Sequence, residues 1–307
     1  MTPRLPDFLV IGAFKSGTTS LIHCLDQHPD IFMPWLQEPN YFGHEEFDPA
    51  DTTPAPPERE TTTVYRRHRT TTSGQYQQLF DGCRADQVSG ECSPQYLTHP
   101  AACARIRRAI PDVKLIALLR NPIERAFSDY SMFVRDGLES DSFAEAVNRT
   151  PTIRPPGHYV ETGMYGRQLL PYFEAFPRNQ MRIHVYEDWV GDPQGLLSSL
   201  YGWLEVDPAF EADTSLRFNV SGVPSSRTVG LAYAAKRRMQ PILKPIVQNR
   251  LPKVQRYVQG RMERGLRSES VPPEVRQELA GEFSEDVALL SGLLERDLSH
   301  WLALPKA

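Results

Sequence analysis

The sequence predicts an α/β fold with a mostly parallel central sheet, helices on both faces of the sheet, and a helical C-terminal part. Two observations support this prediction. Apolar runs that predict strands occur at residues 8–11, 113–119 and 181–186. The run at 113–119 is continuous except for Lys114, which is typical of a strand that is covered on both faces. Segments with apolar residues at helical spacing lie between and beside these runs. Such an alternation favours parallel strands connected by helices.

The first unit consists of the strand at residues 8–11, a tight turn, and a helix from Thr19 to about Gln27. The turn and the helix start read Gly12-Ala13-Phe14-Lys15-Ser16-Gly17-Thr18-Thr19-Ser20. The first turn of a helix offers free backbone N–H groups and the positive end of the helix dipole, and Lys15 adds an ammonium group. We therefore expect this turn to bind an anion.

The turn almost matches the phosphate-binding loop of nucleoside triphosphatases, G-x-x-x-x-G-K-[ST]. Gly12 and Gly17 have the required spacing. However, Thr18 occupies the position of the lysine, and the only lysine of the turn is the earlier Lys15. This difference predicts a phosphate-like ligand other than ATP or GTP with magnesium.

The second unit is the strand at residues 113–119, followed by Arg120 and by Pro122, which suits the first turn of a helix. Ser128 lies about two helical turns beyond Arg120, so both side chains can face one anion. Arg120 and Lys15 each follow the carboxyl end of a predicted parallel strand, so both fall at the same edge of the sheet. Ligands of parallel sheets bind at this edge. A triphosphatase would carry an acidic magnesium ligand after this strand. A solvated arginine and an exposed serine are the alternatives.

The remaining elements are a helix at residues 166–176 that precedes the strand at 181–186, and a closing helix over 273–301. Residues 45–75 are rich in proline, threonine and charge, and we expect them to form a long surface excursion. Residues 150–158 are expected to form a second loop.

Composition sets the class of protein. We expect residues 1–307 to form a single domain, because 40% of them are hydrophobic and no linker divides the chain. No apolar segment follows a basic region at the N-terminus, and no apolar run approaches the roughly 20 residues that span a bilayer, so we expect a soluble, cytoplasmic protein. The cysteines lack the spacing of a zinc site and are expected to be free thiols: Cys24, Cys83, Cys92 and Cys103.

Several segments, in order along nearly the whole chain, resemble the sulfotransferases that use 3′-phosphoadenylyl sulfate. The resemblance includes the 5′-phosphosulfate loop at residues 15–20 and the 3′-phosphate segment at 120–128. Gln37-Glu38-Pro39-Asn40-Tyr41-Phe42 is similar to the K-E-P-x-[FY]-F element of the carbohydrate and heparan-type branch. Further matches lie at residues 90–97, 163–165, 186–189, 219–227 and 298–301. The resemblance implies the P-loop-like version of the α/β fold.

The resemblance also implies how the donor binds. Lys15 would hold its 5′-phosphate and bridging oxygen, while Arg120 and Ser128 would bind its 3′-phosphate and Arg227 would close over it. Backbone N–H groups and hydroxyls of the loop would cradle the phosphosulfate: Ser16, Gly17, Thr18, Thr19 and Ser20. The donor would be 3′-phosphoadenylyl sulfate and the product adenosine 3′,5′-bisphosphate, with no metal required.

The acceptor hydroxyl needs a base. The resemblance places the carboxylate of Glu38 in the cleft facing the sulfuryl group, and we expect Glu38 to be this base. Without the resemblance, a surface-loop carboxylate or a helix cap would be the favoured interpretation of Glu38. His44 and Glu91 are the reserve candidates.

Two positions depart from the pattern of this branch. Gln37 replaces the lysine before the glutamate of K-E-P, and Cys92 replaces the lysine of the E-K-[ST]-P segment. Both replacements remove positive charge that would help to bind an anionic polysaccharide, so they disfavour a glycosaminoglycan acceptor. Cys92 itself is interpreted as a packed small residue.

A basic region lies near residues 231–267, with a helical, amphipathic pattern. Its cations are offset only by Glu263, and they are Lys236, Arg237, Arg238, Lys244, Arg250, Lys253, Arg256, Arg261, Arg264 and Arg267. The region can be a solvated helical face, an anionic acceptor site, or a docking surface for a membrane or a carrier protein. No motif supports binding of nucleic acid.

We therefore expect a sulfotransferase that moves a sulfuryl group to a hydroxyl, or to an amine, by in-line displacement. The acceptor would be a carbohydrate, a glycolipid or a natural-product alcohol. Two alternatives come from other classes: a P-loop kinase or NTPase, and a non-catalytic anion-binding module built around the basic region.

Overall fold

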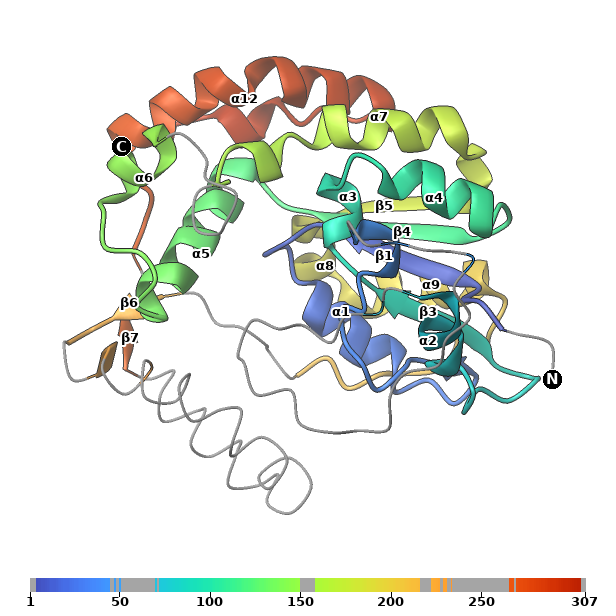
Figure 1. The fold of residues 1–307 in the computed structure, drawn as a ribbon. Helices are drawn as coiled ribbons and strands as arrows, with labels where there is room; N and C mark the ends of the chain where they lie inside the picture. The colour runs from blue at the N-terminus through green and yellow to red at the C-terminus, as the bar shows by residue number, and fades with distance from the viewer. Residues whose placement is uncertain are drawn as a thin grey trace.

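A parallel sheet forms the centre of the computed structural model (Figure 1). Its strands lie in the order β2-β3-β1-β4-β5. They are β1 (Phe8–Gly12), β2 (Ile31–Phe32), β3 (Val88–Cys92), β4 (Lys114–Leu119) and β5 (Met181–Val185). The structure describes residues 4–44, 47, 50, 70, 72–149, 158–215, 222–226, 229, 230, 233, 265–267 and 269–304.

The sheet confirms the predicted fold class and the three strands that the apolar runs predicted. It also contains β2 and β3, which the sequence did not predict. β2 has only two residues, and β3 has the polar sequence Val-Ser-Gly-Glu-Cys. Ser89 and Glu91 are fully buried in β3. A buried polar strand is stable only when tertiary hydrogen bonds satisfy its side chains, and no local pattern reveals such partners.

The helices cover both faces of the sheet. They are α1 (Thr18–Leu25), α2 (Ser73–Gln78), α3 (Gln95–Thr98), α4 (Ala102–Ala109), α5 (Pro122–Arg135), α6 (Phe143–Asn148), α7 (Tyr165–Ala175), α8 (Tyr186–Gly191), α9 (Pro193–Leu204) and α12 (Pro273–Leu294). Single turns of 3₁₀ helix are η1 (Tyr41–Gly43), η2 (Glu161–Gly163), η3 (Arg178–Gln180) and η4 (Ser299–Leu302). A short antiparallel pair joins β6 (Val223–Pro224) to β7 (Leu266–Arg267).

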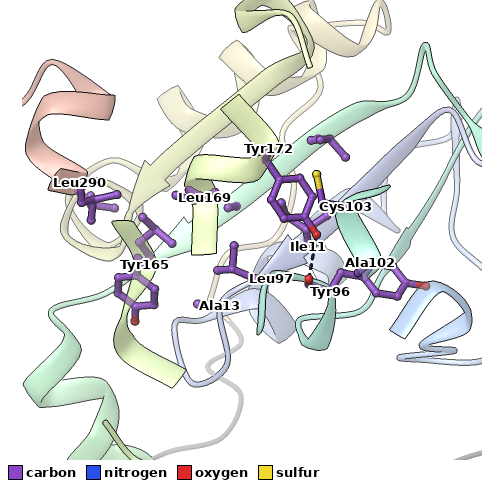
Figure 2. Close-up of a cluster of buried hydrophobic side chains, with 14 of the residues drawn as sticks. Ile11, Ala13, Tyr96, Leu97, Ala102, Cys103, Tyr165, Leu169, Tyr172 and Leu290 are labelled. Carbon is purple, nitrogen blue, oxygen red and sulfur yellow. Dashed lines mark hydrogen bonds between the residues drawn. The ribbon is translucent and has the colours of Figure 1, made fainter. Parts of the chain in front are cut away.

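Alternate residues of β1 point into two separate cores, as the two-residue period of a strand requires. Leu9 and Ile11 belong to the cluster that contains buried residues of α4, α7 and α12. Phe8 and Val10 belong to the cluster that contains buried residues of α1 and α9. Part of the first core is drawn in Figure 2, where the Tyr172 hydroxyl of α7 donates to the Tyr96 backbone carbonyl of α3 at 2.8 Å.

The C-terminal helix packs along α7, and the two lie side by side above the sheet (Figure 1). The Asp286 carboxylate accepts the backbone N–H groups of Gly166 and Arg167 at 2.8 and 2.9 Å. The helix predicted over 273–301 ends at Leu294, because Glu295 adopts a left-handed conformation with φ of 52°. The chain then turns so that Trp301 of η4 is buried against the fold.

The excursion predicted over residues 45–75 is wrong at its end. Thr70, Thr72 and Ser73 are buried, and α2 begins at Ser73. The Thr72 hydroxyl accepts the Gln75 backbone N–H at 3.2 Å, which caps the helix. Tyr76, with no exposed surface, anchors α2 in the core. Most of residues 45–71, like residues 150–157, lies outside the described part of the chain.

The structure describes all four cysteines but only a small part of the basic region. All four cysteines are free thiols, as predicted. Of the basic region at 231–267, the structure describes only Tyr233 and residues 265–267. Among the described residues, no helix has the length and apolar character needed to cross a membrane.

Candidate active site

The loops that follow three neighbouring strands, β3, β1 and β4, meet at one edge of the sheet. In the parallel register, Val10 of β1 lies opposite Cys92 of β3 and Ile116 of β4. The carboxyl ends of these strands therefore lie together. The loop after β1 carries Lys15, the loop after β3 carries Ser93, and Arg120 follows β4 directly. Lys15 and Arg120 were predicted to lie at this edge.

The conformation of the loop between β1 and α1 depends on Gly17. Its φ is +90°, in the left-handed region that favours glycine. A Cβ atom on this residue would lie 3.0 Å from Cε2 of Tyr186, the first residue of α8. The loop is also tied to the sheet, because the Ala13 backbone N–H donates to the Leu118 carbonyl at 2.9 Å.

The start of α1 presents hydrogen-bond donors that are available to a ligand. Gly17 is the N-cap residue, and no side chain caps the helix. Among the described residues, the backbone N–H groups of Ser16, Gly17 and Thr18 have no hydrogen-bond acceptor. The positive end of the helix dipole adds to these donors. The loop therefore has the chemistry of an anion-binding site.

Lys15 lies half-buried against α5, where its Nζ is 3.5 Å from Sδ of Met132. Burial lowers the pKa of Lys15 to about 8, and the positive charges of Arg135 and Arg120 act in the same direction. The carboxylates of Asp129 and Asp136 partly oppose this shift. Lys15 forms no ion pair with any carboxylate in the described part of the chain. A bound anion would supply the missing negative charge.

Arg120 is brought to the same loop. One guanidinium nitrogen donates to the Lys15 backbone carbonyl at 3.4 Å, and the guanidinium lies 5.2 Å from the ring centroid of Tyr186. The ring of Tyr186 thus contacts both Arg120 and the Gly17 position. No individual role was predicted for Tyr186, although it lies in the matched segment 186–189.

Ser128 lies on α5, which begins at Pro122 as predicted. The Asn121 side chain caps this helix by accepting the Ile123 backbone N–H at 2.9 Å. Ser128 is 3% exposed, so the alternative that it is an exposed serine is wrong. Met132, which contacts Lys15, lies one helical turn further along the same face of α5. This places the Ser128 face of α5 toward the loop. Arg227 lies outside the described residues.

Glu38 lies on the other side of the edge, next to the end of β3. It is half-buried, and its negative charge raises the pKa of the Glu91 carboxyl and of the Cys92 thiol, in addition to the larger effect of burial. The backbone at Glu38 has a φ of 54°, and Asn40 has a φ of 53°. The Asn40 side-chain amide donates to the Glu38 carbonyl at 2.8 Å, which closes the turn.

The two reserve bases, Glu91 and His44, lie in different environments. Glu91 has no exposed surface and accepts hydrogen bonds from Tyr76, Tyr96 and Ser93, so it is a structural carboxylate that a solvent-borne acceptor does not reach. His44 is half-buried, and its backbone carbonyl accepts from Arg105 at 2.6 Å. Cys92 is 5% exposed, in agreement with its interpretation as a packed residue.

The sequence model described as the Sulfotransferase family matches residues 6–211. Heparan sulfate glucosamine 3-O-sulfotransferase 3B1 of Mus musculus is 28% identical over 204 residues, which cover 66% of this chain and 46% of the relative. Membrane-associated sulfotransferase kil1 of Dictyostelium discoideum is 32% identical over 176 residues, covering 57% of this chain and 33% of the relative. The chain thus spans about half the length, or less, of these curated relatives.

A solved structure extends the similarity to almost the whole chain. The sulfotransferase from Alicyclobacillus acidocaldarius is 30% identical, with a TM-score of 0.70, and the match covers 98% of this chain and 100% of that one. The family match includes the anion loop, β3, Arg120 and Ser128. The family uses a sulfonate donor, which agrees with an anion site at the start of α1. The chain belongs to the sulfotransferase family.

Proposed function

We propose that this protein is an enzyme that transfers a sulfuryl group from 3′-phosphoadenylyl sulfate to a hydroxyl of a carbohydrate acceptor. The observation that carries this proposal is the loop after β1, where backbone N–H groups are available to a ligand and where the ammonium of Lys15 has no carboxylate partner among the described residues. The family match and the solved sulfotransferase structure support the same assignment.

The described residues fit the donor. The N–H groups of residues 16–18 would hold its 5′-phosphosulfate, and Lys15 would neutralise the bridging oxygen. Arg120 and Ser128 would hold the 3′-phosphate, since β4 and α5 bring both residues to the side of the loop on which Met132 contacts Lys15. These donors are set by the fold before binding, and such preorganised groups are worth about 3 kcal/mol each in comparable sites.

The donor supplies an activated sulfuryl group with a good leaving group. Glu38 would accept the proton of the acceptor hydroxyl as the acceptor oxygen forms its bond to sulfur. The bond between sulfur and the bridging oxygen breaks, and the protonated Lys15 balances the charge that develops on the leaving phosphate. Lys15 and Glu38 lie on opposite sides of the strand edge, Lys15 toward α5 and Glu38 toward β3. An acceptor between them would allow in-line transfer.

We propose a carbohydrate of low negative charge as the acceptor. The mouse relative is named for heparan sulfate glucosamine, which supports a sugar hydroxyl as the acceptor class. Gln37 and Cys92, however, stand where heparan-type enzymes carry lysines, and Cys92 is buried. Because both positions lie beside Glu38, the acceptor side of the site has lost two positive charges that an anionic polymer would use.

Two measurements test the proposal. Calorimetric titration should show tight binding of adenosine 3′,5′-bisphosphate and weak binding of ATP with magnesium; the reverse order would favour a kinase and refute the proposal. Transfer of labelled sulfuryl to a panel of neutral and anionic oligosaccharides should then fall about 100-fold or more in Glu38→Gln, because a lost base typically costs this much.

Lys15→Ala should weaken both bisphosphate binding and transfer. Lys114→Ala is the matched control. The Lys114 ammonium donates to the Trp203 carbonyl and pairs with Glu205 at the opposite end of β4, so its loss should leave transfer unchanged. Equal effects of the two substitutions would contradict the assigned role of Lys15.

A further inference from the structure

The carboxylate of Glu91 lies at the centre of a buried polar cluster. Its Oε1 accepts the hydroxyls of Tyr76 at 3.1 Å and Tyr96 at 2.7 Å, and its Oε2 accepts the hydroxyl of Ser93 at 2.8 Å. The donors come from α2, α3 and the loop after β3. All four residues have no exposed surface. The cluster therefore joins three elements that lie next to the turn that carries Glu38.

Two hydroxyls of this cluster also hold that turn. The Asn40 backbone N–H donates to Ser93 Oγ at 3.0 Å, and the Phe42 backbone N–H donates to Tyr96 Oη at 3.5 Å. A hydroxyl has one proton and can accept with its lone pairs. Because Ser93 and Tyr96 direct their protons to Glu91, their oxygens are left to accept the two backbone N–H groups. The carboxylate thus sets the direction of the hydrogen bonds that run from the Asn40 and Phe42 N–H groups through the two hydroxyls to Glu91.

The turn needs this support. Glu38 and Asn40 both have left-handed backbone conformations. Asparagine adopts this conformation readily, but for a glutamate it is unfavourable and persists only where the surroundings impose it. The next residue, Tyr41, connects the turn to α2: its ring stacks on the Tyr76 ring, with centroids 4.4 Å apart and an interplanar angle of 17°. Thus Tyr76 contacts the turn through its ring and Glu91 through its hydroxyl.

We propose that Glu91 is a positioning residue for the transfer reaction. By orienting the Ser93 and Tyr96 hydroxyls, it holds residues 38–42 in the conformation that presents the Glu38 carboxylate to the acceptor. This inference rests on the proposed function, because it assumes that Glu38 is the base of the transfer reaction. Glu91 itself does not contact the acceptor, since its oxygens are fully buried and already accept three hydrogen bonds.

Glu91→Gln tests the inference with almost no change of shape. An amide at Oε2 would donate to Ser93 Oγ instead of accepting from it, so the Ser93 proton would have to turn toward the Asn40 N–H. The turn should then loosen. In the free protein, hydrogen exchange of the backbone amides of Asn40 and Phe42 should accelerate, while exchange in the middle of α5 should not change.

The kinetic expectation follows from the displaced base. At a pH near 8, where the wild-type Glu91 is mostly ionised, kcat should fall on the order of 100-fold, the effect of a displacement of about 1 Å. The affinity for adenosine 3′,5′-bisphosphate should stay unchanged, because the phosphate loop is held by β1, β4 and α8. In a Glu38→Gln background, Glu91→Gln should cause no additional loss of kcat.

Further variants keep the test decisive if Glu91→Gln does not fold. Ser93→Ala and Tyr96→Phe each remove one link and should also accelerate exchange at residues 40–42 and lower kcat. Tyr201→Phe is the matched control, because Tyr201 is equally buried but donates to the Cys24 carbonyl on the other face of the sheet, at 3.2 Å. It should lower stability only.

The outcomes separate the two proposals. Wild-type kcat in folded Glu91→Gln, or a full additional loss in the Glu38→Gln background, would overturn the positioning role. Wild-type transfer by Glu38→Gln would overturn the proposed base instead. In that case the exchange measurement would still decide whether Glu91 holds the turn.

Discussion

The lowered pKa of Lys15 leads to a pH dependence of donor binding. Burial and the neighbouring arginines reduce this pKa from 10.5 to about 8. An anionic ligand favours the protonated amine, so binding should raise the pKa and take up a proton. With a pKa of about 8, the protonated fraction falls from about nine tenths at pH 7 to about one tenth at pH 9. The affinity for adenosine 3′,5′-bisphosphate should therefore fall roughly tenfold over this range.

The assay is calorimetric titration at pH 7, 8 and 9 in buffers with different ionisation enthalpies, which reports both affinity and proton uptake. Phosphate groups complete their own ionisation near pH 6, so this window isolates the lysine. Lys15→Arg is the control, because a guanidinium stays protonated and its binding should be nearly flat between pH 7 and 9. A flat wild-type profile, or an equal decline in Lys15→Arg, would refute the reasoning.

Three further predictions concern the supports of the site. Gly17→Ala should weaken bisphosphate binding and destabilise the fold by about 1 kcal/mol or more, measured by urea unfolding, because of the positive φ and the nearby Tyr186 ring. Tyr186→Leu should weaken bisphosphate binding by about 0.5–1 kcal/mol, since Arg120 loses its ring contact, whereas Tyr186→Phe should bind normally. Asp286→Ala should cost about 1–3 kcal/mol of stability by leaving the Gly166 N–H and its neighbour without an acceptor, with bisphosphate affinity unchanged.

Controls accompany each of these measurements. Gly281→Ala, in α12 where a Cβ meets open space, should not destabilise the fold, so a loss equal to that of Gly17→Ala would contradict the loop argument. Equal binding by the leucine and phenylalanine variants would exclude a role of the ring. A drop in bisphosphate affinity in Asp286→Ala would contradict the third prediction, because it would mean that the packing of α7 on α12 affects the conformation of the anion loop.

The part of the site that was predictable lies within continuous segments. The apolar run before Gly12 and the glycines, lysine and hydroxyls after it are adjacent in the sequence, so strand, loop and helix start could be recognised together. The same holds for β4, Arg120 and the start of α5 at Pro122. Tyr186 and Met132 could not be given roles, because their importance comes from contacts with residues that are distant in sequence.

By itself, the sequence determined the α/β class, the anion loop and the candidates Lys15 and Glu38, because each depends on a local pattern of apolar, glycine and charged residues. The tertiary structure was needed to show that Glu91 is fully buried and that its carboxylate already accepts hydrogen bonds. The physical reason is that a buried carboxylate must find its hydrogen-bond donors in space. Those donors, Tyr76 and Tyr96 among them, come from separate helices whose convergence no local pattern encodes.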